Sequence, residues 1–218
     1  TFLSGMWPRR PTAAHCSELG AAMARMHLAA ADFPGRRTND LSVSGWRPLY
    51  KATTHRGHSM ALELKRELEE ELDSLEASWP RALPCGIIHA DLFPDNVFFA
   101  DSTLSGVIDF YFACSDFLSY DLAVCLNAWC FEPDGSFNIT KARRLVQAYR
   151  GVRELTCEEL DALPILARGA AMRFLLTRLY DWLNTPKTAL VTRKNPMEYL
   201  QKMRFHRGVR GFGGYGLE

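Results

Sequence analysis

The 218-residue sequence lacks three features that would each point to a particular class of protein. It has no uninterrupted apolar run of about 18 residues, the length of a membrane span, and no basic segment followed by an apolar one at its start. It also has almost no net charge, because 26 Lys and Arg oppose 25 Asp and Glu, which argues against nucleic-acid binding. We therefore expect a cytoplasmic protein without membrane or nucleic-acid partners.

The six cysteines form no C-x-x-C pair, and no histidine stands at zinc-finger spacing from them, so a zinc site is not expected. Most of them lie in apolar stretches of a chain that is large enough to fold without disulfides. Buried free thiols are therefore expected. With 47% hydrophobic and 23% charged residues, the composition is that of a globular protein with a sizeable core.

Helical patterns dominate the sequence. Apolar residues recur at helical spacing over segments 12–32, 59–79, 116–131, 140–150 and 156–183. Segments 156–159 and 195–198 have the residues of helix starts, with capping-box spacing. Between the first two helices, segment 32–56 is rich in Pro, Gly and Ser, and we expect an ordered loop there, with Trp46 and Tyr50 as anchors.

Three short β-rich runs, 86–88, 97–99 and 107–110, interrupt the helical pattern and are expected to form strands that present a polar loop. The fold class we expect is therefore α+β and predominantly helical, with a small β-hairpin that carries that loop.

Three oxygen-bearing side chains fall on the loop and the strand end next to it: Asp91, Asn96 and, 13 residues later, Asp109. This set suits phosphoryl transfer from a magnesium nucleotide, because Mg²⁺ prefers carboxylate, amide and phosphate oxygens. Asn96 and Asp109 are the candidate metal ligands. Asp91, five residues before Asn96, is the candidate that orients an incoming hydroxyl and takes its proton.

The spacing H-x-D-x-x-x-x-N with a downstream I-D-F resembles the aminoglycoside phosphotransferase and choline kinase branch of the protein-kinase-like fold. Within that branch, the sequence is similar to homoserine kinases over segments 107–116, 120–123, 126–132, 173–182 and 205–207. The resemblance implies the C-terminal lobe of a kinase that uses ATP and Mg²⁺, with Asp91 as the catalytic carboxylate and with Asn96 and Asp109 as metal ligands.

The same resemblance implies supporting roles. His89 would support the catalytic loop, and Asp121 would brace it from the following helix. Phe2, Leu3 and Ser4 resemble the connector between the two lobes, whose backbone meets the adenine. We therefore expect residues 1–5 to be this connector, residues 6–207 to be the helical catalytic and substrate lobe, and residues 208–218 to be a flexible tail. The nucleotide lobe is expected to lie outside this chain.

Purely structural interpretations of the same residues also stay open. Asp and Asn are common in turns, a histidine such as His89 is often satisfied by backbone hydrogen bonds, and Asp121 could complement a helix dipole. The glycines at 211, 213 and 216 spell G-x-G-x-x-G, but no strand precedes them and no helix has room to follow, so a phosphate loop is not expected there.

Substrate contacts are harder to assign. A homoserine carboxylate and ammonium need a cation and an acidic partner. Arg173 and Arg178 are five residues apart on one expected helix and so diverge by roughly 140°, which favours only one of them, and an ion pair is the alternative for the other. Asp116 and Glu132 are the acidic candidates.

The activity we expect is phosphorylation of the hydroxyl of L-homoserine to O-phospho-L-homoserine, a step of threonine biosynthesis. A kinase of the same fold that acts on choline, an aminoglycoside or another amino alcohol is the first alternative, and a catalytically silent binding module is the second. A two-metal phosphoesterase is disfavoured, because its metals would need more His and Asp ligands than the motif offers.

Overall fold

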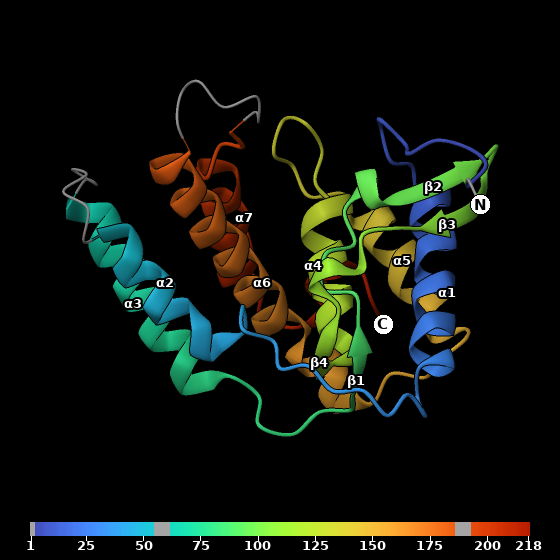
Figure 1. Cartoon of the computed structure of the whole chain (residues 1–218), viewed down its shortest axis with the longest axis horizontal. Coiled ribbons are helices and arrows are strands. Elements are labelled where there is room, and N and C mark those ends of the chain that lie inside the picture. The colour runs from blue at the N-terminus through green and yellow to red at the C-terminus, as the bar shows by residue number, and fades with distance from the viewer. Residues whose placement is uncertain (1–2, 55–61, 186–192) are drawn as a thin grey trace.

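The computed structural model describes residues 3–54, 62–185 and 193–218 (Figure 1). Phe2 of the expected connector and Ser59, where a helix was expected to begin, lie outside these residues. The helices are α1 Ala13–Ala29, α2 Val43–Thr54, α3 Leu62–Ser78, α4 Leu118–Trp129, α5 Ile139–Arg150, α6 Cys157–Asn184 and α7 Met197–Gly208, and the strands are β1 Cys85–Ile88, β2 Val97–Ala100, β3 Thr103–Val107 and β4 Cys114–Phe117.

The strands form two small antiparallel sheets, one in which β1 pairs with β4 and one in which β2 pairs with β3. The loop that carries Asp91 connects β1 to β2, so it starts in one sheet and ends in the other. The expected mostly helical α+β fold is confirmed, and the turn between β2 and β3 makes the expected hairpin.

Helix α4 lies at the centre of the fold, and almost all of its residues are buried. It packs against the long helix α6, which in turn packs against α7 and α2, while α1 and α5 pack together on the other side (Figure 1). The indole of Trp129 at the end of α4 donates a 2.7 Å hydrogen bond to the carbonyl of Leu92. Through this contact the central helix holds the candidate catalytic loop.

Side chains cap the starts of α1 and α6, and the cap of α6 is the capping box predicted at 156–159. The box predicted at 195–198 does not form, because the N-cap of α7 is Pro196, which makes no side-chain capping hydrogen bond. The hydroxyl of Thr12 accepts from the backbone N–H of His15 at the start of α1. The capping box at the start of α6 is complete, because the hydroxyl of Thr156 and the carboxylate of Glu159 each accept from the other's backbone N–H. These local bonds satisfy the free N–H groups of the first helical turn.

Three expectations about secondary structure are wrong. The run 107–110 was expected to be a strand, but β3 ends at Val107 and Phe110–Phe112 form a 3₁₀ helix. Helix α2 occupies about half of the segment expected to be a loop, even though Pro48 lies inside it. Its residues Trp46 and Tyr50, one helical turn apart, are both buried, so packing of this face outweighs the poor helix propensity of the segment. In addition, a helix was expected to begin at Asp116, but this residue belongs to β4.

The expected flexible tail is packed against the body. Residues Phe212–Tyr215 form a short 3₁₀ helix, and the Tyr215 side chain is fully buried. The Tyr215 hydroxyl lies 2.8 Å from Nδ1 of His206 on α7, and burial lowers the pKa of His206 to about 3. One aromatic anchor therefore fixes a segment whose glycines alone suggested flexibility.

All six cysteines are free thiols, and four of them are buried. This agrees with the expectation of free rather than paired cysteines. In the part of the chain that the structure describes, none of the helices has both the length and the apolar character that crossing a membrane requires.

Gly20 lies where α1 meets α5, and a methyl group there would stand 2.1 Å from the carbonyl oxygen of Leu145. We expect Gly20→Ala to lower the free energy of unfolding by about 1–3 kcal/mol, because overpacking outweighs the better helix propensity of Ala. Urea unfolding measures this. The control is Gly151→Ala, where φ is −66° and the nearest atom is 3.5 Å away. The control should leave stability unchanged or raise it, and equal effects of both changes would contradict the packing argument.

Candidate active site

The candidate catalytic loop begins at a turn that is unusual for its residues. Ala90 has a φ of 63°, and Asp109, which follows β3, has a φ of 62°. Residues other than glycine rarely adopt this left-handed conformation, and it persists only where surrounding contacts hold it. The turn at Ala90 comes directly before Asp91, and the second turn is formed by Asp109 itself. The side chains of Asp91 and Asp109 line the same cavity.

Asp121, on α4, supplies the contacts that hold the first of these turns. One of its carboxylate oxygens accepts from the backbone N–H of Ala90 at 2.7 Å, and the other accepts from the backbone N–H of His89 at 2.8 Å. The second oxygen also lies 3.1 Å from Nε2 of His27 on α1. Asp121 therefore contacts the backbone at the start of the loop, and it does not line the cavity of Asp91.

The Asp121 carboxylate is fully buried, and burial alone would raise its pKa. The hydrogen bonds from His27 and from the His89 backbone outweigh this, so the pKa of Asp121 is lowered below its usual range. His27 in turn lies 2.8 Å from the hydroxyl of Tyr149 on α5. These contacts thus connect the candidate catalytic loop to helices α1, α4 and α5.

His89 is buried, and its ring bonds to the backbone at both nitrogens. Nδ1 accepts from the N–H of Asp91 at 3.3 Å, so Nε2 carries the proton and donates to the carbonyl of Ile108 at 2.9 Å. This agrees with the structural interpretation of His89. The ring joins the backbone of Asp91 to that of Ile108, the residue before Asp109, and so it fixes the two halves of the candidate site relative to each other.

A cavity of about 240 Å³ lies over this loop. Its acidic and amide groups come from the loop and the strand end, and its basic groups come from α6 and from the segment before α7. The lining residues are Asp91, Phe93, Asp95, Asn96, Asp109, Phe174, Arg178 and Lys194. The three residues on which the sequence interpretation rests are therefore brought together.

The amide of Asn96 has a defined orientation. Its Nδ2 donates to the backbone carbonyl of Asp91 at 2.8 Å, and because a carbonyl can only accept, the NH₂ group must face it. Oδ1 is then free to act as a ligand beside the carboxylate of Asp109. One neutral oxygen and one carboxylate fit Mg²⁺ when it also takes phosphate oxygens and water. Among the described residues, no group of three His, Cys, Asp or Glu side chains forms a metal site by itself.

The Asp91 carboxylate is partly buried. Burial raises the pKa of Asp91 above its usual range, and the charge of Arg173 opposes this effect, with a guanidinium nitrogen 3.9 Å from the carboxylate. A carboxylate that is held out of water in this way is a better proton acceptor than an exposed one.

The two candidate arginines have different surroundings. Arg173 is buried, donates to the carbonyl of Ala90 and lies over the Phe174 ring. It therefore supports the loop rather than facing the cavity. Arg178 lines the cavity, bonds Glu198 at 2.7 Å and stacks on the Tyr199 ring.

The two acidic candidates do not reach the Asp91 cavity. Asp116, on β4, accepts a 2.7 Å hydrogen bond from the side chain of Asn39. Glu132 accepts from Lys141 at 2.6 Å on the wall of a second cavity. Asp116 pairs with Gly86 across the β1–β4 sheet, and Glu132 follows the C-terminal end of α4, so neither lines the cavity of Asp91.

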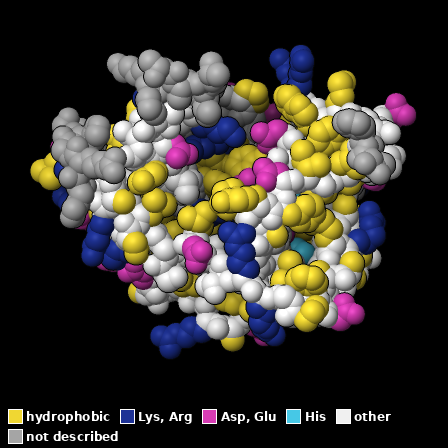
Figure 2. Space-filling view, viewed as in Figure 1, with side chains coloured by type: hydrophobic (Ala, Val, Ile, Leu, Met, Phe, Trp, Pro, Cys, Tyr) yellow, Lys and Arg dark blue, Asp and Glu magenta, His cyan; other side chains and the backbone are white. Residues whose placement is uncertain are grey.

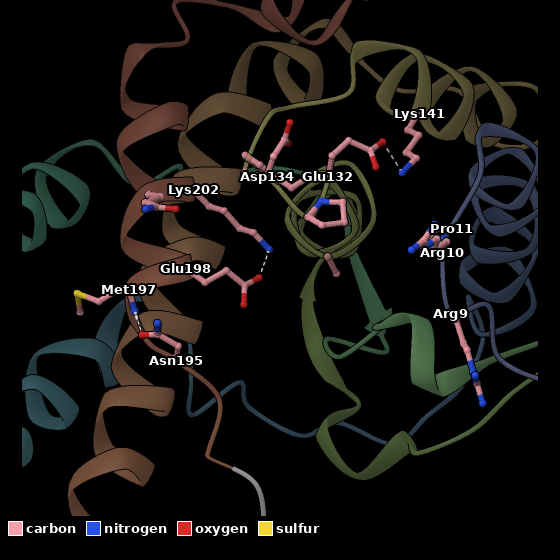
Figure 3. A pocket seen from close by; sticks show the side chains of 15 residues that line it. Arg9, Arg10, Pro11, Glu132, Asp134, Lys141, Asn195, Met197, Glu198 and Lys202 are labelled. Carbon is pink, nitrogen blue, oxygen red and sulfur yellow. Dashed lines mark hydrogen bonds and ion pairs between the residues drawn. The ribbon is translucent and has the colours of Figure 1, made fainter.

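The second cavity has a volume of about 850 Å³ and is bounded by α7, the loop after α4 and the segment before α1 (Figure 3). Glu198 and Lys202 extend into it from α7 and bond each other at 2.6 Å, and the Glu132–Lys141 pair lies on a separate wall. The face of the molecule seen in Figure 1 has a hollow with an apolar floor and with basic and acidic side chains around it (Figure 2). Sequence reasoning missed Lys194, which lies outside any recognised motif, and it assigned Glu198 only to the helix-start signature of segment 195–198.

The connector residues run beside the hairpin. The carbonyl of Ser4 accepts from the hydroxyl of Ser105 on β3, and the side chain of Leu3 lies over Gly106, where a methyl group would be only 2.6 Å away. Met6 forms an antiparallel bridge with Phe99 of β2. The segment expected to meet the adenine is thus held at the edge of the β2–β3 sheet.

Comparison with known proteins agrees with this architecture. Residues 1–155 match the phosphotransferase enzyme family (APH). The whole chain aligns with the homoserine kinase of Rhodospirillum rubrum at 64% identity over 217 residues, and with that of Paramagnetospirillum magneticum at 63% over 224 residues. The chain spans 68% and 69% of these two relatives.

Among solved structures, a choline kinase from Cryptosporidium parvum superimposes with a TM-score of 0.68 at 16% identity, covering 94% of this chain and 68% of that one. This likeness concerns the fold, which is that of the kinase-like phosphotransferases. The identity of more than 60% to two curated relatives and the match to the family model show the family. The chain belongs to the homoserine kinase family of the APH phosphotransferases.

Proposed function

We propose that this protein transfers the γ-phosphoryl group of ATP to the hydroxyl of L-homoserine and releases O-phospho-L-homoserine and ADP. The observation that carries the proposal is the single cavity of about 240 Å³ that brings Asp91, Asn96 and Asp109 together. The names of the relatives supply the acceptor, and the position in threonine biosynthesis follows from the product.

In the proposed mechanism, Asp91 orients the homoserine hydroxyl and accepts its proton. The oxygen of that hydroxyl forms a bond to the γ-phosphorus while the bond from this phosphorus to the β,γ-bridging oxygen breaks, and ADP leaves with the electron pair. Arg173 and Asn96 hold Asp91 in position, through the 3.9 Å ion pair and the 2.8 Å bond to its backbone carbonyl. Most of the catalytic effect is then positioning and charge neutralisation.

Asn96 and Asp109 are the residues that would hold Mg²⁺. When bound, the ion would neutralise phosphate charge and align the triphosphate. Leu3 and Ser4 would contribute backbone groups beside the nucleotide base. His89 and Asp121 would keep the loop in its catalytic conformation without touching either substrate.

A substrate panel tests the proposal. Full-length protein is assayed for ADP release with L-homoserine, choline, ethanolamine and an aminoglycoside, and the product is identified by phosphorus NMR. We expect kcat/KM for L-homoserine to exceed that of every other acceptor by about 100-fold or more, the margin that one fully recognised charged group gives. A higher kcat/KM with choline or the aminoglycoside would contradict the proposal, and so would the absence of acceptor-dependent ADP release.

A further inference from the structure

The basic residues beside Asp91 match a particular class of substrate. Arg178 and Lys194 both line the cavity of Asp91, from α6 and from the segment before α7. The other charged residues of this cavity, Asp91, Asp95 and Asp109, are acidic and come from the loop and the strand end. The cavity therefore has an acidic wall, in which Asp91 and Asp109 face the proposed hydroxyl and metal, and a basic wall formed by Arg178 and Lys194.

Arg178 is held ready for a ligand. Its guanidinium stacks 4.3 Å from the centroid of the Tyr199 ring, and Nη1 donates to Glu198 at 2.7 Å. About 10% of the side chain is exposed. A planar guanidinium that is fixed by stacking and by one ion pair loses little entropy when its other N–H groups bind a carboxylate.

Lys194 completes the basic wall. Lys194 is exposed, and its Nζ lies 5.3 Å from the centroid of the Phe93 ring, which lines the same cavity. The aromatic ring steers the ammonium without neutralising its charge. Lys194 thus leaves a positive charge available beside Arg178.

Glu198 adds an acidic group next to this wall. One of its oxygens bonds Arg178 and the other bonds Lys202, yet 49% of its side chain remains exposed, and it extends into the adjoining larger cavity (Figure 3). Each carboxylate oxygen can accept a second hydrogen bond. A ligand ammonium can therefore bind Glu198 while Arg178 stays paired with it.

We propose that Arg178 and Lys194 bind a substrate carboxylate and that Glu198 binds the adjacent ammonium, so that this site selects an α-amino acid whose side chain ends in a hydroxyl. This inference rests on the proposed kinase function and specifies its acceptor. An adjacent acid and base complement an amino-acid zwitterion, whereas Glu198 would repel a second phosphate group.

The dimensions agree with the proposal. Three carbon atoms separate the hydroxyl oxygen of homoserine from its carboxyl carbon, so these atoms lie roughly 5 Å apart in an extended molecule with carbon–carbon bonds of about 1.5 Å. A substrate of this length can span a cavity of about 240 Å³ with its hydroxyl at Asp91. Choline, ethanolamine and aminoglycosides have no carboxylate and would leave the basic wall unpaired, which costs affinity.

The test compares three acceptors in full-length protein: L-homoserine, 3-aminopropan-1-ol, which lacks the carboxylate, and 4-hydroxybutyrate, which lacks the ammonium. We expect Lys194→Met and Arg178→Met each to lower kcat/KM for homoserine by about 10–100-fold, the effect of one charged hydrogen bond, and that for 3-aminopropan-1-ol by less than about 3-fold. Glu198→Gln should lower kcat/KM for homoserine but spare 4-hydroxybutyrate. Where an analogue is not phosphorylated, its inhibition constant against homoserine replaces kcat/KM.

Two features make the comparison decisive. Lys194 is exposed and outside any helix or strand, so Lys194→Met tests the proposal even if Arg178→Met fails to fold. Arg204→Met is the control, because Arg204 lies on α7 but pairs with Glu67 on α3 at the surface, and it should leave all the ratios unchanged.

The outcomes separate this inference from the proposed function. If Arg178→Met and Lys194→Met lower kcat/KM for homoserine and for 3-aminopropan-1-ol by the same factor, the basic wall does not bind the carboxylate. The inference is then overturned, while the proposed homoserine kinase activity stands. If the unmodified protein prefers 3-aminopropan-1-ol to homoserine, both are overturned.

Discussion

Asp91→Asn should reduce kcat by about 10²–10⁴-fold, the range found when a general base is removed, with little change in the dissociation constant for ATP. The amide keeps the shape of the side chain but cannot accept the hydroxyl proton. Asp91 lies 3.9 Å from Arg173 and shares its cavity with Asn96 and Asp109, so its place in the site is retained. Steady-state kinetics with homoserine and a separate nucleotide titration measure the two quantities.

Asp95→Asn is the matched control, because Asp95 lines the same cavity but is exposed on the short 3₁₀ turn after Asp91. The same change there should alter kcat by only a few-fold. Burial raises the pKa of Asp91, so its charge opposes folding at neutral pH, and Asp91→Asn should unfold at the same temperature as the unmodified protein or higher. Turnover close to normal in Asp91→Asn would remove this residue from its proposed role.

Local signals in the sequence predicted much of the fold. Helices α1, α5 and α6 have apolar periodicity, and each has a side chain that caps its first turn through a bond within a few residues of the chain. The motif of the candidate site was equally local, because Asp91 and Asn96 share one loop. Nothing beyond the spacing of residues 89–109 was needed to expect them at one site.

The elements that could not be predicted depend on contacts with residues that are far away in the sequence. Helix α2 forms because Trp46 and Tyr50 are buried against other elements, and β4 forms because it pairs with β1, some thirty residues earlier. The basic wall is the same kind of case, since Lys194 joins the cavity of Asp91 only after α6 and α7 have packed. No local pattern marks a lysine whose role depends on such an arrangement.

Asp121→Asn should lower the free energy of unfolding by about 3–5 kcal/mol, the cost of breaking a fully buried charged interaction. Three donors converge on this carboxylate: the N–H groups of His89 and Ala90, and Nε2 of His27. An amide presents an NH₂ group in place of one oxygen, so at least one buried donor loses its acceptor. Urea unfolding measures the change, and we expect kcat to fall by about tenfold or more because the turn at Ala90 loses its support.

Asp161→Asn on the exposed face of α6 is the control, and its effect should stay within about 0.5 kcal/mol. The pH dependence separates a lost charge from a lost shape. The pKa of Asp121 is lowered by its hydrogen bonds, so the folded state binds its proton less readily than the unfolded chain, and the stabilisation is present above about pH 4 and lost as the pH falls further. The stability difference between the unmodified protein and Asp121→Asn should therefore shrink below about pH 4. A difference that stays constant through this range would mean that Asp121 acts by packing and not as a charged acceptor for the catalytic loop.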